Sequence, residues 1–512
     1  MSEITAPAGE LVLPHSYDDF QGIDSSRDVA SLDTGERQFL YSLTNGYANF
    51  RGIILRDRGV KQRATTPGDR LIHHVAFFGS DLIAWAQRDG GGITLKAEPN
   101  GTEAIEVYTK NSIISSTVFN NKLVFFSRDQ QVYTYDGFAF TASTNTKDKP
   151  AFGVAIQRRL AIAGGVGRQT IVDLSRVDDM TVFTQDEPDG GTEVTKAADI
   201  DISNIIGSND EITGLGVFEK SKLAVFTKDQ AVVYKISPDF TKWAIDENAS
   251  VNIGCVSHNT IASVGTDLIF CSRSGVHSLR RSEANGITIY AVNLSSNIEE
   301  LYKKLFRTVA NPKDISGFYD QDLGQYHVYF PQNDQTCVRL TMTISPSPDV
   351  PSKWSTSTFL NQRCGASLGG ITCYGTSGGV FDVVEYEDDT TADIIPDMEI
   401  VTPILWHGSI TETKQTREFI LQASGRGRIK IEAFKSTGEL MASYTVDLDG
   451  PEEGDDDRTF LPLSKQYNRP FVHQYKGVQF KITTIGGTGR IKIIGLAVLV
   501  DVTKQQLQQR GR

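Results

Sequence analysis

Two glycine-rich segments are the first places where this chain could do chemistry. Residues 375–379 have the sequence Gly-Thr-Ser-Gly-Gly, and residues 164–168 have the sequence Gly-Gly-Val-Gly-Arg. A phosphate-binding loop precedes a helix, whose N-terminal amide groups hold the anion, but residues 164–168 lie between two strand-like apolar runs. Residues 375–379 also lie between apolar runs. Both segments are therefore predicted to be hairpin turns, not a phosphate site or a nucleophile elbow.

Histidines and carboxylates are the remaining candidates. His73 and His74 are adjacent, so a strand would direct them to opposite faces, where they could not easily share one metal ion. Residues 452–457 (Glu-Glu-Gly-Asp-Asp-Asp) offer the hard oxygen ligands of calcium, but their spacing fits no standard calcium loop and favours a solvated turn. Sequence spacing singles out no glycosidase-type carboxylate pair. We therefore expect no catalytic residue, no cofactor or cofactor-binding residue, and no metal ligand.

The composition is that of an acidic globular protein. The 512 residues include 63 acidic and 51 basic side chains, for a formal charge of −12. An acidic chain without a long basic run is poorly suited to gripping nucleic acid through its phosphates, although DNA could slide past a surface of like charge. The same charge could simply maintain solubility, so both interpretations stay open.

Cysteine usage and hydropathy indicate where the chain is made. The five cysteines are widely spaced and form no CxxC pair, which predicts buried free thiols in a reducing cytosol. No run approaches about 18 apolar residues, so no membrane span is expected. The first ten residues have neither the basic start nor the apolar core of a secretory signal. We expect synthesis in the cytosol, with export only inside a larger particle.

A repeated pattern organises the middle of the chain. One copy of the pattern consists of two apolar strands joined by the turn Ser127-Arg128-Asp129-Gln130. The same pattern occurs 100 residues later, with the turn Thr227-Lys228-Asp229-Gln230. A third copy contains Ser272-Arg273-Ser274-Gly275. Weaker copies occupy residues 72–96, 154–173, 315–340 and 366–384. Each copy is a pair of hairpin strands with apolar residues on both faces. These faces are buried from solvent only if the copies stack against one another.

The repeat predicts the fold class. A spacing of about 40–50 residues is typical of β-propeller blades. We therefore predict an all-β protein with a β-propeller of about seven blades over residues 61–390; a series of β-sandwiches with a chance likeness between strands is the alternative. One helix is expected on the rim of a blade, starting at a capping box of Ser296 and Glu299 and continuing with apolar residues at helical spacing.

The sequence pattern changes after about residue 385. Residues 385–397 are rich in acidic side chains and are predicted to form a linker. The regular alternation of strand-like segments and glycine-rich turns that follows predicts a C-terminal β-sandwich over residues 391–503. Residues 1–60 are expected to form an N-terminal extended segment with the first strands. Residues 504–512 are a polar tail, which either frays or reaches a neighbouring subunit.

The order of these features resembles that of a known family. Residues 45–59 (NGYANFRGIILRDRG) combine an Asn-containing turn, a strand and an Arg-containing element, as at the start of phage packaged-DNA stabilisation proteins, also called tail nozzle or hub proteins. The middle of the chain is similar to this family in the blade at 270–279, the helix at 296–306, the segment YDQDLGQYHVYFP at 319–331, and Trp354-Ser355. The apolar last strand at 491–500 also fits. The likeness extends over about residues 40–500 and rests on the order of the motifs.

The resemblance implies a structural virion protein of a short-tailed phage tail. Such a protein forms a homo-oligomeric ring, hexameric in this family, below the portal and adaptor proteins, and assembles in the host cytoplasm. The ring extends the DNA channel, helps to retain packaged DNA until ejection, and anchors tail fibres or spikes. DNA passes through the lumen without specific binding, and no enzymatic activity is implied.

Two other classes of protein stay open. One is a propeller-type carbohydrate-active enzyme with an appended sandwich domain, which needs at least two carboxylates within about 5–10 Å of each other at a central pocket. The other is a cellular propeller that acts as a protein-interaction scaffold. The chain lacks a recurring Trp-Asp dipeptide, which argues against the commonest version of such scaffolds.

Overall fold

The computed structural model confirms that the chain is all-β. It describes residues 12–32, 38–65, 71–88, 91–97, 105–109, 115–128, 131–143, 149–183, 195–206, 210–247, 249–279, 282–284, 287–289, 292–345, 351–384, 392–408, 410–449, 465–470, 473–486 and 491–503. The chain divides into two compact units. Unit 1 comprises residues 1–61, 341–359 and 384–512, and unit 2 comprises residues 62–340 and 360–383.

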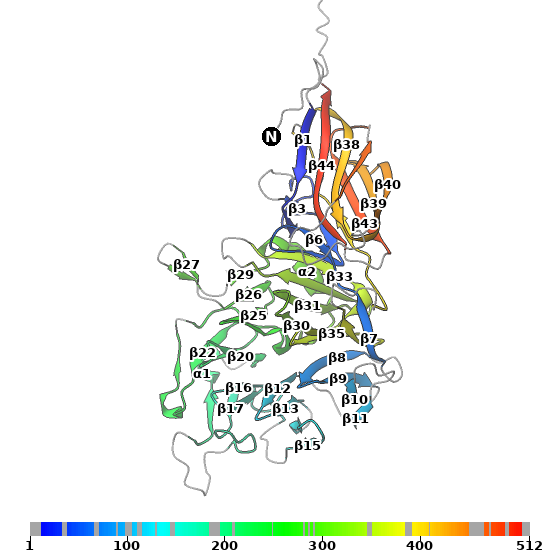
Figure 1. The fold of residues 1–512 in the computed structure, drawn as a ribbon. Helices are drawn as coiled ribbons and strands as arrows, with labels where there is room; N and C mark the ends of the chain where they lie inside the picture. Colours follow the sequence, from blue (N-terminus) through cyan, green and yellow to red (C-terminus); the bar gives the residue numbers. More distant parts are fainter. Residues whose placement is uncertain are drawn as a thin grey trace, which may run out of the picture. The chain divides into compact units, whose positions relative to one another are not determined.

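Unit 2 begins with three small antiparallel sheets whose strands lie side by side in sequence order (Figure 1). The first sheet contains β8 (Ile72–Phe78), β9 (Asp81–Arg88), β10 (Gly91–Ala97) and β11 (Ile105–Thr109). The second contains β12 (Ser115–Phe119), β13 (Lys122–Phe126), β14 (Tyr133–Tyr135) and β15 (Phe140–Ala142). The third contains β16 (Phe152–Ile156), β17 (Arg159–Ala163), β18 (Ile171–Leu174) and β19 (Ala198–Asp201).

Four more sets of strands follow the same plan. The fourth contains β20 (Gly214–Phe218), β21 (Lys222–Phe226), β22 (Ala231–Lys235) and β23 (Ala244–Ile245). The fifth contains β24 (Ala262–Val264), β25 (Asp267–Cys271), β26 (Val276–Ser278) and β29 (Val292–Asn293). In the sixth, β30 (Ser316–Asp320), β31 (Gln325–Pro331) and β32 (Cys337–Thr343) pair in this order and are the first three strands of a nine-stranded sheet. The seventh contains β34 (Cys364–Leu368), β35 (Ile371–Gly375) and β36 (Gly379–Val383).

The fourth strand of the seventh sheet comes from the other end of the array. This strand is β7 (Val60–Thr65), which precedes the first sheet in sequence and pairs with β36. The two strands approach so closely that a Cβ atom on Gly379 would lie 2.2 Å from the carbonyl oxygen of Ala64, so only glycine fits there. The buried Arg63 donates to the Ala97 carbonyl oxygen in β10 and to Asp382 in β36, each at 3.0 Å. Arg63 therefore connects the first sheet with the seventh.

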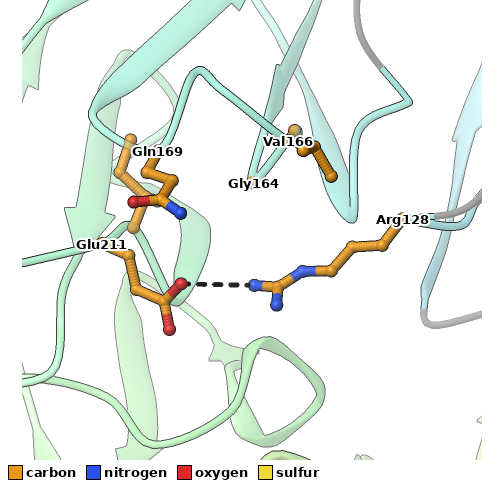
Figure 2. A pocket seen from close by; sticks show the side chains of 7 residues that line it. Arg128, Gly164, Val166, Gln169 and Glu211 are labelled. Atoms are coloured by element: carbon orange, nitrogen blue, oxygen red, sulfur yellow. Dashed lines mark ion pairs between the residues drawn. The ribbon is translucent and has the colours of Figure 1, made fainter.

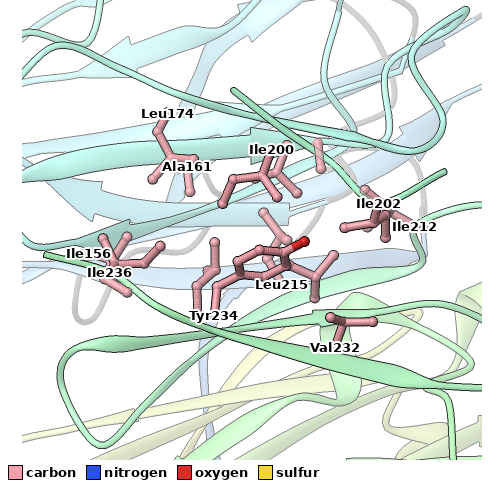
Figure 3. Close-up of a cluster of buried hydrophobic side chains, with 14 of the residues drawn as sticks. Ile156, Ala161, Leu174, Ile200, Ile202, Ile212, Leu215, Val232, Tyr234 and Ile236 are labelled. Atoms are coloured by element: carbon pink, nitrogen blue, oxygen red, sulfur yellow. The ribbon is translucent and has the colours of Figure 1, made fainter. Parts of the chain in front are cut away.

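Neighbouring sheets pack through their apolar faces. The first strands β8, β12, β16, β20, β24, β30 and β34 each lie next to the following one, and β34 lies next to β8. Figure 3 shows the cluster between the third and fourth sheets, where Ile156 and Leu174 pack with Leu215, Val232 and Tyr234. Burying one such aliphatic side chain contributes about 1.5–3 kcal/mol. A comparable cluster of buried residues joins the first sheet to the seventh.

The predicted helix forms, but the predicted capping box is wrong. A 3-10 turn, Ser296–Ile298, leads into α2 (Glu299–Thr308), which buries Tyr302 and Leu305. No side chain caps either element. The hydroxyl of the preceding Ser295 instead accepts from the amide of Val276 at 2.9 Å, so it holds strand β26. The helix is anchored by Tyr302, whose hydroxyl donates to the Ser272 carbonyl oxygen at 2.5 Å.

Unit 1 contains two sheets that face each other. One is formed by β1 (Val12–Tyr17), β5 (Gly46–Ala48), β6 (Ile54–Arg56), β38 (Thr413–Ser424), β41 (Lys465–Pro470), β42 (Gln474–Tyr475) and β44 (Lys492–Thr503). The other includes β4 (Ser42–Thr44), β33 (Lys353–Ser357), β37 (Glu399–Val401), β39 (Arg426–Lys435), β40 (Leu440–Asp449) and β43 (Val478–Ile485). The rings of Phe419 in β38 and Phe480 in β43 are 4.9 Å apart, which places both in the core.

Segments far apart in sequence therefore contribute to unit 1. Strand β1 pairs with β44, and β4 pairs with β37, so residues 1–60 and 391–503 contribute strands to the same two sheets. A parallel pair, β2 (Phe20–Ile23) and β3 (Gln38–Leu40), also belongs to this unit. The acidic cluster at 452–457, residues 385–391 of the expected linker and the tail at 504–512 lie outside the described residues.

The cysteines match their predicted state, because all five are buried and free. Within the described ranges, no helix has both the length and the apolar character needed to cross a membrane.

Removing the Arg63 side chain is expected to weaken the link between the first and seventh sheets. Arg63→Ala should lower the free energy of unfolding by about 2–4 kcal/mol, because Asp382 and the Ala97 carbonyl oxygen lose a buried donor. Urea denaturation followed by fluorescence measures the change. The control Arg158→Ala removes an exposed guanidinium paired with Asp178 and should leave stability almost unchanged. Equal effects of the two substitutions would contradict the role of Arg63.

Candidate functional site

A buried hydroxyl group recurs in unit 2 at the turn after the second strand of a sheet. Thr227 follows β21; its hydroxyl accepts from the Gln230 amide at 3.2 Å, and its own amide donates to the Gln230 carbonyl oxygen at 2.8 Å. The amides of Ser272 and Thr376 donate to the carbonyl oxygens of Gly275 and Gly379, at 2.8 and 3.0 Å. The repeated Ser or Thr in the sequence is therefore a turn-forming residue.

The residue after this hydroxyl is basic in several copies, and two of these side chains meet at Glu211. One carboxylate oxygen of Glu211 lies 3.4 Å from Lys228 Nζ and 2.8 Å from Lys313 Nζ. The other lies 3.8 Å from a guanidinium nitrogen of Arg128. Arg128 follows β13, Lys228 follows β21 and Lys313 precedes β30. The second, fourth and sixth sheets thus each supply one cation to a single carboxylate.

These charges keep Glu211 ionised. Burial favours the neutral carboxyl, but the hydrogen bond from Lys313 and the charges of Lys313, Lys228 and Arg128 outweigh it and lower the pKa of Glu211 below 4.5. Asp210 adds a second carboxylate, which accepts from the Glu211 amide at 2.9 Å and faces the Lys228 amide at 3.4 Å. The cluster therefore contains three cations and two carboxylates, an excess of one positive charge.

A hollow of about 70 Å³ lies beside this cluster. Figure 2 shows the Arg128 side chain extending toward Glu211, with the loop of Gly164 and Val166 on another side and the Gln169 amide close to Glu211. A space of this size has room for several water molecules or a small polar group, since one water needs about 10–15 Å³ on the same measure. Among the described residues that line it, Glu211 is the single carboxylate, and it is already paired with cations.

The two glycine-rich segments form turns between strands, as predicted. Residues 164–168 connect β17 to β18, and the Arg168 amide donates to the Gly165 carbonyl oxygen at 3.2 Å. Residues 376–378 connect β35, which ends at Gly375, to β36, which begins at Gly379. The letters of residues 375–379 fit the pattern Gly-x-Ser-x-Gly, but a nucleophile elbow leads from a strand into a helix.

The two adjacent histidines both lie in β8 and make different contacts. The ring of His73 lies 5.5 Å from that of Trp85, while His74 Nε2 is 2.8 Å from the Ser116 hydroxyl in the next sheet. Burial lowers the pKa of His74 to about 4, so it is neutral near pH 7. In the part of the chain that the structure describes, no three His, Cys, Asp or Glu side chains are grouped to hold a metal ion.

Sequence reasoning found part of the cluster and missed its centre. Arg128 and Lys228 stand at the second position of the repeated turn, so the repeat itself marked them. Glu211 and Lys313 belong to connections outside the repeat, and nothing local distinguishes them from other surface charges. Their pairing joins residues 102 positions apart, which single-sequence patterns do not reveal.

Comparisons with known proteins add little. No family model matches the chain, and no curated protein sequence is similar to it. A computationally designed protein, Ika8, is 10% identical and covers 64% of this chain and 100% of its own, with a TM-score of 0.35. PorZ, a surface component of the type-IX secretion system of Porphyromonas gingivalis, is 10% identical and covers 79% of this chain and 60% of its own, with a TM-score of 0.36.

A third solved structure is also similar. The extracellular domain of the putative one-component system BT4673 from B. thetaiotaomicron is 11% identical, with 67% of this chain and 51% of its own covered and a TM-score of 0.33. The chain thus spans about half of this protein's length and three fifths of PorZ. TM-scores this low support no argument about function.

The ionised Glu211 is expected to stabilise unit 2 in a pH-dependent way. Glu211→Gln should lower the free energy of unfolding by about 1–2 kcal/mol at pH 7, because three cations lose their shared partner. Since the pKa is lowered on folding, this contribution is complete above about pH 4.5 and is lost as the pH falls through the folded-state value. Denaturant unfolding of both proteins between pH 3 and 7 measures it.

The matched control is Glu439→Gln, which removes an exposed carboxylate paired with Lys435 in unit 1. This substitution should change stability little at any pH. Equal stability of Glu211→Gln and the unmodified protein at pH 7 would show that the Glu211 cluster contributes nothing.

Proposed function

We propose that the chain is a non-enzymatic structural subunit of a phage tail, a tail nozzle or hub protein of a short-tailed phage. In this proposal, a seven-bladed β-propeller is joined to a β-sandwich, and copies of the chain form a hexameric ring below the portal and adaptor proteins. The ring extends the DNA channel, helps to retain packaged DNA until ejection, and carries fibres or spikes on its outside.

The packing order of the sheets supports a closed propeller. Successive first strands lie side by side, and the series returns from β34 to β8. Strand β7 links the two ends of the array, because it precedes the first sheet in sequence but is the fourth strand of the seventh sheet. Such a closure keeps the first and seventh sheets from separating. The two facing sheets of unit 1, with their shared apolar core, support the β-sandwich.

The observation that carries the structural role is the number of covalent connections between the two units. The chain passes from one unit to the other at residues 61–62, 340–341, 359–360 and 383–384, which makes four connections. Two domains joined by a single linker move independently unless their interface is large. A ring subunit must hold its two parts together under the pressure of packaged DNA, and four connections serve that purpose.

The Glu211 cluster bears on the path of the DNA. In a wheel of seven blades, the second, fourth and sixth blades approach one another only near the axis. Because these three sheets supply Arg128, Lys228 and Lys313, the cluster would occupy one end of the propeller's own tunnel. DNA would therefore run through the lumen of the ring, between subunits, where an acidic surface lets it slide without binding.

The oligomeric state of the intact chain tests this proposal. The purified protein should assemble into six-fold rings with a matching portal–adaptor complex, and mass photometry should count six copies per complex. Incubation with host surface polysaccharide should release no new reducing ends, in contrast to the carbohydrate-active alternative. A chain that stays monomeric in the presence of the adaptor, or that cleaves the polysaccharide, would overturn the assignment.

A further inference from the structure

We propose that the hollow beside Arg128 is a binding site for a small oxyanion, a phosphate or carboxylate group, held between the Arg128 guanidinium and the loop at residues 164–167. Oxyanion binding here does not require the ring assembly proposed above, so its failure would leave that assembly untouched.

Arg128 has unused hydrogen-bonding capacity. A guanidinium carries five N–H donors in a planar fork that matches the oxygens of a carboxylate or phosphate. The nearest acceptor is Glu211, at 3.8 Å, which is longer than a hydrogen bond. Among the described residues, Arg128 makes no hydrogen bond within the protein, although two thirds of its side chain is shielded from solvent. Its donors are therefore available to a group in the hollow.

The opposite wall is made of main chain. Gly164 and Gly165 line the hollow without side chains, so a bound group can approach the backbone closely. Gly164 and Gly167 have φ values of +79° and +84°, a backbone conformation that favours glycine at both positions. The Gln169 side chain adds a further amide donor at the same hollow (Figure 2). No helix follows this loop, so the donors available to an oxyanion are the side chains of Arg128 and Gln169.

Charge and size select the class of ligand. The cluster has three cations and two carboxylates, so an added anion would neutralise its excess positive charge. Lys228 and Lys313 are paired with Glu211. Of the three cations, Arg128 lines the hollow (Figure 2). A volume of about 70 Å³ has room for a tetrahedral or planar oxyanion.

Titration of the full chain with inorganic phosphate, and separately with acetate, tests the site. Chloride keeps the ionic strength constant, and isothermal calorimetry or the shift in melting temperature reports binding. We expect saturable binding with a Kd on the order of millimolar. Arg128→Gln should weaken it about tenfold, because the charged donor is lost. Glu211→Gln should tighten it several-fold, because a competing carboxylate is removed.

The control Arg158→Gln removes an exposed guanidinium that does not line the hollow, and it should leave the affinity unchanged. Binding of phosphate alone identifies a phosphate group as the ligand, and comparable binding of acetate identifies a carboxylate, such as an acidic side chain of a partner. If Glu211→Gln does not fold, Arg128→Gln against Arg158→Gln decides the matter. No saturable binding by the unmodified protein, or equal affinity in Arg128→Gln, would overturn the proposal.

Discussion

Each small sheet of unit 2 has two apolar faces, and it keeps both away from water only by lying between two other sheets. All five residues of β17 are buried, although successive side chains point to opposite faces of the sheet. Across the fourth and fifth sheets, the rings of Phe226 and Phe270 are 4.7 Å apart. A linear stack of these sheets would leave one apolar face exposed to solvent at each end. The first and seventh sheets share a cluster of buried residues, and Arg63 hydrogen-bonds to both.

The sequence predicts the strands of this fold better than their partners. Short apolar runs and the repeated Ser/Thr turn mark the hairpins, because neighbouring strands are joined by short turns and the pattern is local. The pairing of β7 with β36 and that of β1 with β44 join distant segments, so no local pattern indicates them. For the same reason the sequence separates residues 1–60 from 391–503. The expected capping box does not form, because Ser296 lies inside a 3-10 turn and Ile298, which has no capping side chain, precedes the helix.

The candidate site follows the same rule. The repeat in the sequence identifies the turn positions of Arg128 and Lys228. Glu211 is recognised as their shared ion-pair partner only in the folded structure, where residues next to three sheets come together around it. Residues 164–168 have the composition of an anion-binding loop but not the helix that usually follows one. The structure offers Arg128 in place of that helix, as a donor that approaches from another sheet. Residues 164–168 can therefore form a turn between two strands and also line the proposed anion site.

The closing role of β7 is the central claim, and hydrogen exchange tests it most directly. Amide exchange of the intact chain, followed by mass spectrometry, reports the stability of each strand separately. If β7 completes the seventh sheet, its backbone amides should exchange as slowly as those of β35 and β36, and all should be released together in denaturant. Rapid exchange of β7 while β35 and β36 remain protected would show that the array is not closed by this strand.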